Sequence, residues 1–422
     1  MRARMTWYLL TALIVAGLLV AGCSRPETGT EPTATTGTTT QPDDTWEPPD
    51  RGGEYEIVFE ADCKWLEDVA QNEMNSALSR EPEIDVVYGH NDPSAHGAFT
   101  ASQQADQERA ETIRFIGIDA LPHEGITYVE EGILAATFEY PTGGPQAIRA
   151  AALLLSGAEV PKNIALGTTV YTAENVGEGG RYVAPDEKEG WVKADALDEM
   201  DEPTLTQEYL VGFSQCNLNE PWRVQMNADV EAAAEAYPEI QLSMKDAQNK
   251  TEDQQAQVRE FIEQGVDLII ISPKESRPLT EPVAEAMEAG IPVIVLDRKI
   301  EGDNYTCFIG GDNVLIGRQA GLWVRETFPD GAYIVELKGL MTSTPAQERH
   351  DGFMQGLRGE GAEPTEEPNP EPGTDEEATE PEPEEGTDGE SPSANDEPAE
   401  TEGTDEEPTD GETETEDEPT SE

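Results

Sequence analysis

Two long regions of this chain alternate short apolar runs with amphipathic stretches, which is the pattern of strands followed by helices. Runs such as Leu268–Ile271 and Val293–Leu296 are apolar without interruption, as parallel strands covered on both faces require. Gly265 and Gly290 stand where helix C-terminal caps are expected. The pattern therefore predicts an α/β fold with parallel sheets, whose strands are expected at 54–60, 84–88, 113–118, 208–215, 240–246, 266–272, 291–297, 305–310 and 332–339.

Further segments complete this alternation. A helix is expected after the first strand, with Trp65, Leu66 and Val69 on its apolar side. Other predicted segments are a mixed unit at 126–138, helices at 145–155 and 344–357, and an extended stretch at 164–171.

The first 22 residues are predicted to be a lipoprotein signal peptide. Arg2 and Arg4 precede an apolar run, and Leu19–Cys23 resembles the bacterial lipobox. The motif implies lipidation of Cys23, which would anchor the mature protein to a membrane outside the cytoplasm, in the periplasm or on the cell surface. The alternative is an ordinary signal peptide followed by an incidental cysteine.

Three segments contain too few apolar residues to build a core. Residues 23–52 are predicted to be a disordered tether, and 360–422 a disordered acidic tail rich in Glu, Pro and Thr. Residues 177–205 are dominated by glycine and charge, with Trp191 and Val192 as the notable apolar pair, and are predicted to be a linker.

Charge and reactive side chains narrow the function further. Of the formal net charge of −63, residues 361–422 contribute −27 and contain no Lys or Arg, which leaves −36 for the rest. Nucleic acid is therefore not an expected partner, because phosphate binding needs clustered cations. Cys63, Cys216 and Cys307 are predicted to be mostly buried thiols, with one pair possible, and the histidines lack the spacing of a metal site. No cofactor, metal or catalytic residue is predicted.

Short motifs carry a family resemblance. In the second region they are Gly212–Gln215, Glu220–Arg223, Val266–Pro273, Gly290–Arg298, Ile309–Asn313, Pro345–Arg349 and Gly352–Phe353. In the first region they are Ala61–Asp62 with Trp65, Ile84–Asp92, Phe115–Asp119, Gly132–Thr137 and Tyr140–Pro141. The second set resembles the amino-terminal part, and the first set the carboxy-terminal part, of the type I periplasmic sugar-binding proteins, the ribose and galactose group that serves ABC transporters.

The two parts stand in reverse order relative to that family. The resemblance thus implies a circular permutant with two doubly wound parallel-sheet lobes and a hinge. Residues 206–331 would form the first lobe and 332–359 the start of the second. Residues 53–176 would supply the family's carboxy-terminal part, mostly second lobe, with a helix at 145–156 in the first lobe. A monomer is expected, and a domain-swapped oligomer is the alternative.

The resemblance also implies a ligand site in the cleft, because doubly wound sheets bind ligands beyond the carboxyl ends of their strands. Aromatic faces would cover the C–H side of a sugar, and polar groups would exchange hydrogen bonds with its hydroxyls. One wall would carry Glu220, Trp222, Arg223, Ser272, Asp297 and Arg298, the other Trp65, Asn91, Asp119 and Arg349, with Tyr140 near the hinge.

Several of these residues also have a structural alternative. Trp65 and Trp222 could be core residues, Asp297 and Arg298 a strand-end ion pair, Asn91 a helix N-cap, and Arg349 a solvent-facing residue.

The expected function is that of an extracytoplasmic lipoprotein that captures a monosaccharide-like ligand and delivers it to an ABC transporter permease. Three alternatives stay open. A glycoside hydrolase would use a carboxylate pair from Glu220, Asp297 and Asp119. A scaffold, adhesion or sugar-sensing protein would keep the fold without transport. A regulator of the lac-repressor kind shares the fold, but the secretion signal and the absence of DNA-binding helices in the sequence count against it.

Overall fold

The computed structural model describes residues 46–362, which belong to one compact unit. The predicted signal peptide, the lipidation site Cys23, most of the predicted tether and nearly all of the acidic tail lie outside the described residues. Among residues 46–362, no helix is long and apolar enough to cross a membrane.

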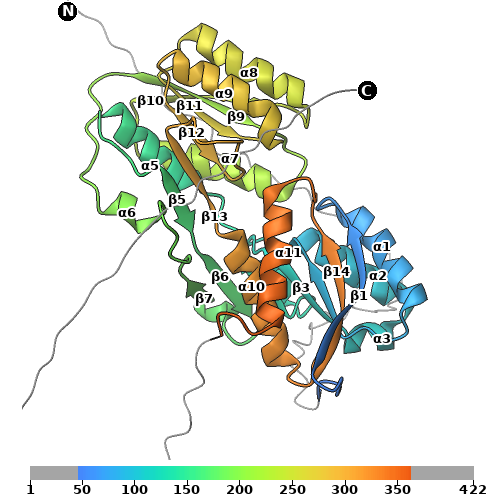
Figure 1. Cartoon of the computed structure of the whole chain (residues 1–422). Coiled ribbons are helices and arrows are strands. Elements are labelled where there is room, and N and C mark those ends of the chain that lie inside the picture. The colour runs from blue at the N-terminus through green and yellow to red at the C-terminus, as the bar shows by residue number, and fades with distance from the viewer. Residues whose placement is uncertain (1–45, 363–422) are drawn as a thin grey trace, which may run out of the picture. The chain divides into compact units, whose positions relative to one another are not determined.

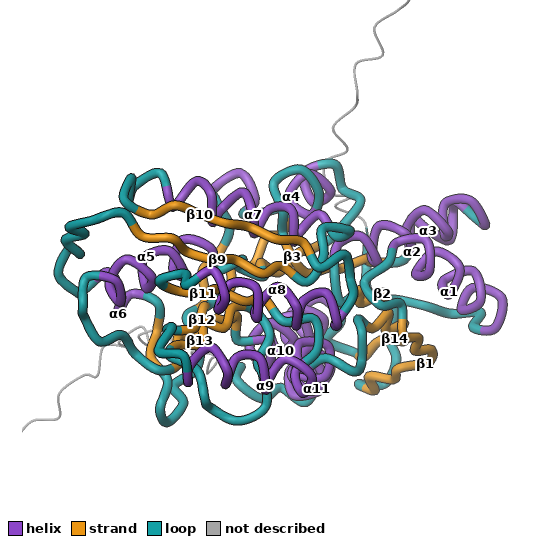
Figure 2. The backbone as a smooth tube through the Cα atoms, turned by 90° about the horizontal axis from the view of Figure 1, so that it is seen from above, coloured by secondary structure: helices purple, strands orange, loops and turns teal. Residues whose placement is uncertain are grey.

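Two seven-stranded sheets organise the described chain (Figure 1). The sheet of the first lobe has the order β10-β9-β11-β12-β13-β5-β8, and Figure 2 shows β10 to β13 side by side. The sheet of the second lobe has the order β1-β14-β2-β3-β4-β6-β7, in which β4–β6 and β6–β7 pair antiparallel and the other strands pair parallel. The prediction of two parallel-sheet lobes is confirmed.

The strands are β1 (Glu54–Asp62), β2 (Val86–Gly89), β3 (Arg114–Asp119), β4 (Ala136–Glu139), β5 (Asn163–Leu166), β6 (Thr168–Thr172), β7 (Arg181–Val183), β8 (Val192–Lys193), β9 (Tyr209–Gln215), β10 (Ile240–Asp246), β11 (Leu268–Ser272), β12 (Val293–Leu296), β13 (Cys307–Gly311) and β14 (Gly331–Lys338). The helices are α1 (Glu67–Arg80), α2 (Asp92–Ala105), α3 (Gln107–Thr112), α4 (Gly125–Glu130), α5 (Gly144–Leu155), α6 (Asp195–Asp198), α7 (Pro221–Ala234), α8 (Thr251–Gln264), α9 (Ser276–Glu288), α10 (Asn313–Thr327) and α11 (Thr344–Leu357), with a 3-10 turn η1 (Val176–Glu178).

Helices cover both faces of each sheet, which explains the uninterrupted apolar runs. In β11, Ile270 packs in the core shared with α5 and α7, while Ile271 packs on the opposite side with α8 and α9. In β2, Val86 packs with α10 and α11, and Val87 with α1 and α2. Because each such side chain contributes roughly 1.5–3 kcal/mol when buried, a strand covered on both faces has few positions for a polar residue before its end.

The chain passes repeatedly between the two lobes. Within residues 46–362 the crossings lie at 140–143 after β4, at Gly167 between β5 and β6, at 184–191 between β7 and β8, and at Asp312 after β13. The predicted extended stretch 164–171 is therefore divided between two sheets. Gly167 permits this change because a Cβ there would lie 2.4 Å from the carbonyl oxygen of Val183.

The predicted linker is an ordered connection that spans the lobes. β7 extends the second-lobe sheet by pairing with β6, and β8 extends the first-lobe sheet by pairing with β5. Between them, Asp186 forms an ion pair with Arg318 at 2.7 Å, and Lys188 with Asp312 at 3.0 Å. The composition of this segment predicted a linker because composition holds no information about open sheet edges, and it is these edges that pair with the short strands β7 and β8.

Two further elements differ from the sequence prediction. Trp65 does not begin a helix: α1 starts at Glu67, and Lys64 and Trp65 form a turn with φ of 56° and 61°. The range 206–331, assigned to the first lobe, includes α10, which packs against α11, β4 and β6 of the second lobe. The helix after β13 crosses over because its apolar face meets α11.

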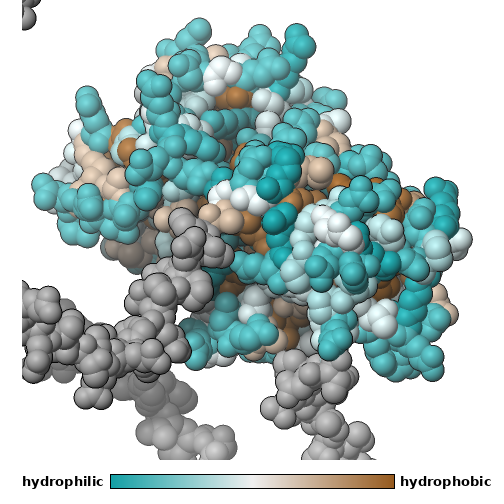
Figure 3. Space-filling model, turned by 60° about the horizontal axis from the view of Figure 1, so that its bottom comes forward, coloured by the Kyte–Doolittle hydropathy of each residue, from teal (hydrophilic) through white to brown (hydrophobic). Residues whose placement is uncertain are grey.

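The face in Figure 3 is mostly hydrophilic, with apolar residues in small patches.

Candidate functional site

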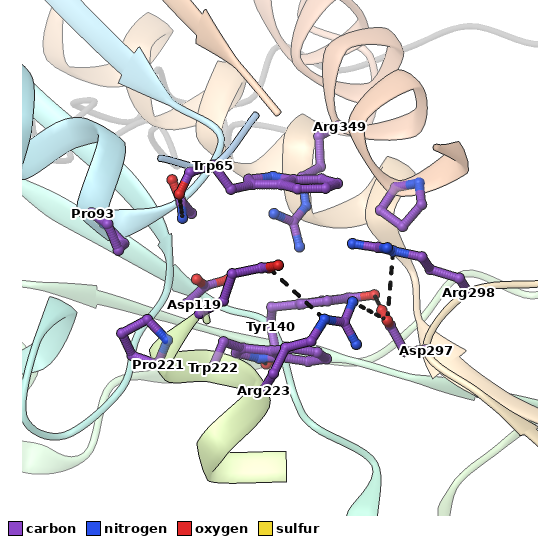
Figure 4. A pocket seen from close by; sticks show the side chains of 13 residues that line it. Trp65, Pro93, Asp119, Tyr140, Pro221, Trp222, Arg223, Asp297, Arg298 and Arg349 are labelled. Carbon is purple, nitrogen blue, oxygen red and sulfur yellow. Dashed lines mark hydrogen bonds and ion pairs between the residues drawn. The ribbon is translucent and has the colours of Figure 1, made fainter. Parts of the chain in front are cut away.

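A pocket lies between the lobes, with an empty volume of about 390 Å³ that includes the part open to solvent. Every predicted site residue lines it except Ser272. The lining residues are Trp65, Asn91, Pro93, Asp119, Pro345 and Arg349 from the second lobe, Glu220, Pro221, Trp222, Arg223, Asp297 and Arg298 from the first, and Tyr140 at a crossing between them (Figure 4).

Strand ends and helix starts place these residues. Trp65, Asn91 and Asp119 follow or end β1, β2 and β3, and Asp297 follows β12. Trp65, Asp119 and Asp297 have positive φ of 61°, 118° and 73°, which non-glycine residues seldom adopt. Such conformations cluster at ligand sites, where the surrounding fold compensates for their cost of about 1–3 kcal/mol each. The turns direct these three side chains into the pocket.

Aromatic rings form two opposite faces of the pocket. Trp222 and Tyr140 stack with ring centroids 4.6 Å apart, and the Trp222 Nε1–H donates to the Tyr140 carbonyl oxygen at 2.6 Å. Trp65 lies on the other side, as Figure 4 shows, and packs closely over Gly339, where a Cβ would come within 2.2 Å of the indole. The guanidinium of Arg298 lies 5.0 Å from the Trp65 ring centroid.

A buried ionic network forms the first-lobe wall. Arg223 donates to Asp297 Oδ2 at 2.7 Å and to Ser272 Oγ at 2.8 Å. The hydroxyl of Tyr140 donates to Asp297 Oδ1 at 2.5 Å. Burial opposes ionisation of Asp297, but Arg223 and Arg298 outweigh it and hold the pKa of that carboxyl below its ordinary value. Burial and the same carboxylate raise the pKa of Tyr140 well above its usual value, which keeps the hydroxyl a donor.

Ser272 is a support for this network. It is fully buried at the end of β11 and does not line the pocket. Its hydroxyl accepts from Arg223 and donates toward Asp297 at 3.4 Å, so it orients both charged groups from below.

The second-lobe wall contains Arg349, which is held by hydrogen bonds, and Asp119, whose carboxyl forms none among the described residues. Arg349 donates to Asn313 Oδ1 at 3.0 Å and to the carbonyl oxygen of His90 at 2.5 Å, and its guanidinium lies 4.3 Å from the centroid of the Tyr140 ring. Among the described residues, no hydrogen bond to the carboxyl of Asp119 is found. Burial raises the pKa of Asp119 well above its ordinary value, while Arg349 acts in the opposite direction.

Several pocket groups thus retain hydrogen-bonding capacity. Trp65 Nε1, Arg223 Nε and Arg298 Nε are buried and have no hydrogen-bond partner within residues 46–362. The two guanidinium nitrogens form longer ion pairs, Arg223 with Glu220 at 3.9 Å and Arg298 with Asp297 at 3.7 Å. Buried donors without a hydrogen bond cost free energy. Together with the acceptor Asp119, they fit a small ligand with several hydroxyls, whose C–H faces would lie against the aromatic rings.

The structural alternatives are resolved in part. Asn91 is an N-cap, since its Oδ1 accepts from the Ser94 amide at 3.1 Å, and it also lines the pocket. Trp65 and Trp222 are both buried and both line the pocket. Arg349 is 2% exposed and does not face bulk solvent. A binding role for these residues stays a prediction.

Three prolines were not predicted from the sequence as pocket residues. Pro93, Pro221 and Pro345 line the pocket at the first turns of α2, α7 and α11. Proline is favoured there because its fixed φ suits a helix start. The available signal was a proline within a few residues after a predicted strand end.

Among the described residues, no group of three or more His, Cys, Asp or Glu side chains could hold a metal ion. Cys63, Cys216 and Cys307 are buried and free, and no pair among them forms a disulfide.

Comparisons with known proteins give one consistent result. The sequence model of the periplasmic binding protein domain matches residues 43–159 and 211–389. A ribose import binding protein of Bacillus subtilis is 31% identical over 147 residues, which are 35% of this chain and 48% of the relative. A galactofuranose-binding protein of Escherichia coli is 34% identical over 163 residues, 38% of this chain and 51% of the relative.

Solved structures are similar over comparable lengths. The binding component of the arabinose ABC transporter from Shewanella sp. ANA-3 is 37% identical, with a TM-score of 0.34, over 36% of this chain and 50% of that chain. A fructose-binding periplasmic domain of a hybrid two-component system is 41% identical, also with a TM-score of 0.34, over 36% and 50%. The chain spans about half the length of the curated relatives it matches.

Proposed function

This chain belongs to the periplasmic binding protein family, and on that premise we propose that it is an extracytoplasmic solute-binding lipoprotein that captures a monosaccharide-like ligand between its lobes. The family resemblance predicted from the sequence is confirmed. The relatives cited above are named binding proteins and none is named an enzyme. The ligands in their names are ribose, galactofuranose, arabinose and fructose.

One observation carries the proposal. The interlobe pocket combines aromatic faces from Trp65, Trp222 and Tyr140 with buried polar groups that have no hydrogen-bond partner among the described residues. A sugar ring presents C–H faces and a rim of hydroxyls, so it complements both features at once.

A thermal-shift screen tests this function. We expect one member of a panel of D-ribose, L-arabinose, D-galactose, D-fructose and myo-inositol to raise the melting temperature, because a ligand at about 1,000 times its Kd stabilises the folded state by about 4 kcal/mol. Asp119→Asn is the matched control: no hydrogen bond to this carboxyl is found among the described residues, so the variant should keep the unliganded melting temperature and lose most of the shift. No shift with any sugar would favour a scaffold role, and turnover of a glycoside would favour a hydrolase.

We further propose that the chain is a circular permutant of this family. If the chain were read from β9 onward and β1 followed β14, both sheets would have the same strand order: the second strand at the edge, then the first, third, fourth and fifth. The strands concerned are β10-β9-β11-β12-β13 in the first lobe and β1-β14-β2-β3-β4 in the second. Arg325 supports the same view, since it donates to the carbonyl oxygen of Leu357 at the end of α11 and lies 5.4 Å from the ring of Tyr55 at the start of β1. The end of α11 and the start of β1 are therefore neighbours in space.

Restoring the inferred ancestral order tests the permutation. A chain that runs from residue 206 to 359 and continues directly into 53–176 should fold as a monomer and bind the same sugar. It lacks the whole linker, residues 177–205, so we expect a modest loss of thermal stability. As a complement, cleavage near Gly190 should leave the two pieces associated and competent to bind. Aggregation of the reordered chain, or separation of the cleaved pieces, would count against the permutation.

Lipid anchoring and delivery belong to the same proposal. Anchoring rests on Leu19–Cys23, and delivery to an ABC transporter rests on family membership. Mass spectrometry of the mature N-terminus should find a diacylated Cys23, and Cys23→Ser should release the protein from membranes.

A further inference from the structure

A buried carboxylate in the second lobe lies outside the ligand pocket. Glu336 of β14 is fully buried, and its Oε1 is 2.9 Å from His90 Nε2. His350 Nδ1 lies 2.9 Å from both carboxylate oxygens. None of the three residues lines the ligand pocket. The carboxylate thus joins three elements, because His90 follows β2 and His350 lies on α11.

The chain neighbours of both histidines do line the pocket. His90 precedes Asn91, and His350 follows Arg349. A second bond connects the same two segments directly, since Arg349 donates to the carbonyl oxygen of His90 at 2.5 Å. Displacement of either histidine would therefore move a pocket residue with it.

We propose that Glu336 is a positioning residue: through His90 and His350 it holds Asn91 and Arg349 in register for ligand binding, and it makes ligand affinity depend on the protonation of His350. The second part rests on the proposed function. Without the carboxylate, the end of β2 and the first turns of α11 would be connected by the Arg349 bond and by packing alone.

The surroundings assign a protonation state to each member. Burial opposes ionisation of Glu336, but the two histidines lower its pKa to about 2, so it stays a carboxylate. Burial lowers the pKa of His90, and its Nδ1 has no hydrogen-bond partner among the described residues; neutral His90 donates from Nε2.

His350 is the member that titrates. Glu336 raises the pKa of His350 above 6.5, against the effect of burial; Lys338 on β14 lowers it and Asp351 on α11 raises it. α10 packs on the Gly352 face of α11 and forms no ion pair with His350 among the described residues. Because the folded-state pKa is raised, the charge-assisted bond is complete at mildly acidic pH and is lost as pH rises through the pKa of His350.

The first test needs no ligand. Side-chain NMR of the unliganded protein should show Arg349 Nε–H and the Asn91 amide shifting with the same midpoint as the His350 ring. Glu336→Gln should abolish that shared midpoint. His96→Gln is the matched control, because His96 pairs with Glu67 at 2.7 Å in the same lobe, while its chain neighbours Ala95 and Gly97 do not line the pocket.

The second test measures affinity by calorimetry, with D-ribose or whichever sugar of the panel binds more tightly. Between pH 5.5 and 8.5 the affinity of the wild type should fall about threefold more than that of His350→Gln, as expected for loss of one partly exposed charged hydrogen bond. His350 is partly exposed, so this variant should fold even where Glu336→Gln does not. If no sugar binds, the proposed function fails and the NMR test still decides the positioning role. Arg349 and Asn91 signals that ignore the His350 titration would overturn the inference.

Discussion

Replacing Asp297 by asparagine should destabilise the protein through Arg223 rather than through lost packing. The side chains of Arg223 and Asp297 are 2% and 1% exposed, and they form a 2.7 Å ion pair. Asparagine keeps the volume, so the change removes charge and leaves the guanidinium with the neutral acceptors Ser272 and Gln215 and the carboxylate of Glu220 at 3.9 Å. Removing one partner of a buried pair costs about 3–5 kcal/mol. Because asparagine still offers an oxygen, we expect a cost of about 3 kcal/mol.

Urea unfolding of four proteins measures this coupling: the wild type, Asp297→Asn, Arg223→Met and the double variant. For unit charges about 4 Å apart at an effective dielectric constant near 20, the attraction is about 4 kcal/mol. Part of it offsets desolvation, so the double variant should recover about 2 kcal/mol relative to the sum of the single variants. The same cycle on Arg259 and Glu285 is the control, since these side chains are 43% and 37% exposed.

The surface pair should give a coupling of at most about 1 kcal/mol that falls in high salt, because exposed ion pairs are screened. The buried pair should hardly respond to salt. A destabilisation of the double variant that equals the sum for Asp297→Asn and Arg223→Met within about 0.5 kcal/mol would refute the argument, because independent sites behave that way.

Three further predictions concern other parts of the fold. Glu336, with its pKa lowered to about 2 from 4.5, contributes stability above pH 4.5 that is lost as pH falls toward 2; Glu336→Gln should remove about 3 kcal/mol of that acid dependence in unfolding curves. Gly339→Ala should displace the Trp65 indole, so tryptophan fluorescence should change and sugar affinity should fall at least about tenfold. Arg318→Gln should break the linker contact with Asp186 and lower the melting temperature by a few degrees at low salt, with little effect in high salt.

Much of the fold follows from local pattern. β10 and α11 have the predicted bounds, 240–246 and 344–357, because periodicity and boundary residues agree there. The pocket residues were predictable for a related reason: a strand covered on both faces admits polar side chains mostly at its end, so Asn91 and Asp119 were expected to meet at the carboxyl ends of neighbouring parallel strands.

Other features depend on which segments meet. The stretch 164–171 is uniformly extended, and only the open edges of both sheets determine that it divides at Gly167. Ser272 stands at a strand end, as several pocket residues do. It does not line the pocket, because Arg223 lies between and donates to its hydroxyl.

The sequence by itself determined two parallel-sheet lobes and the polar residues at the ends of their strands, because burial and periodicity act on neighbouring residues. The tertiary structure alone decided that the linker spans both lobes and that Glu336 lies between His90 and His350. Glu336 is 246 positions from His90 and 14 from His350. Contacts at such separations have no local pattern, since a buried carboxylate is tolerated only after distant chain segments bring its partners to it.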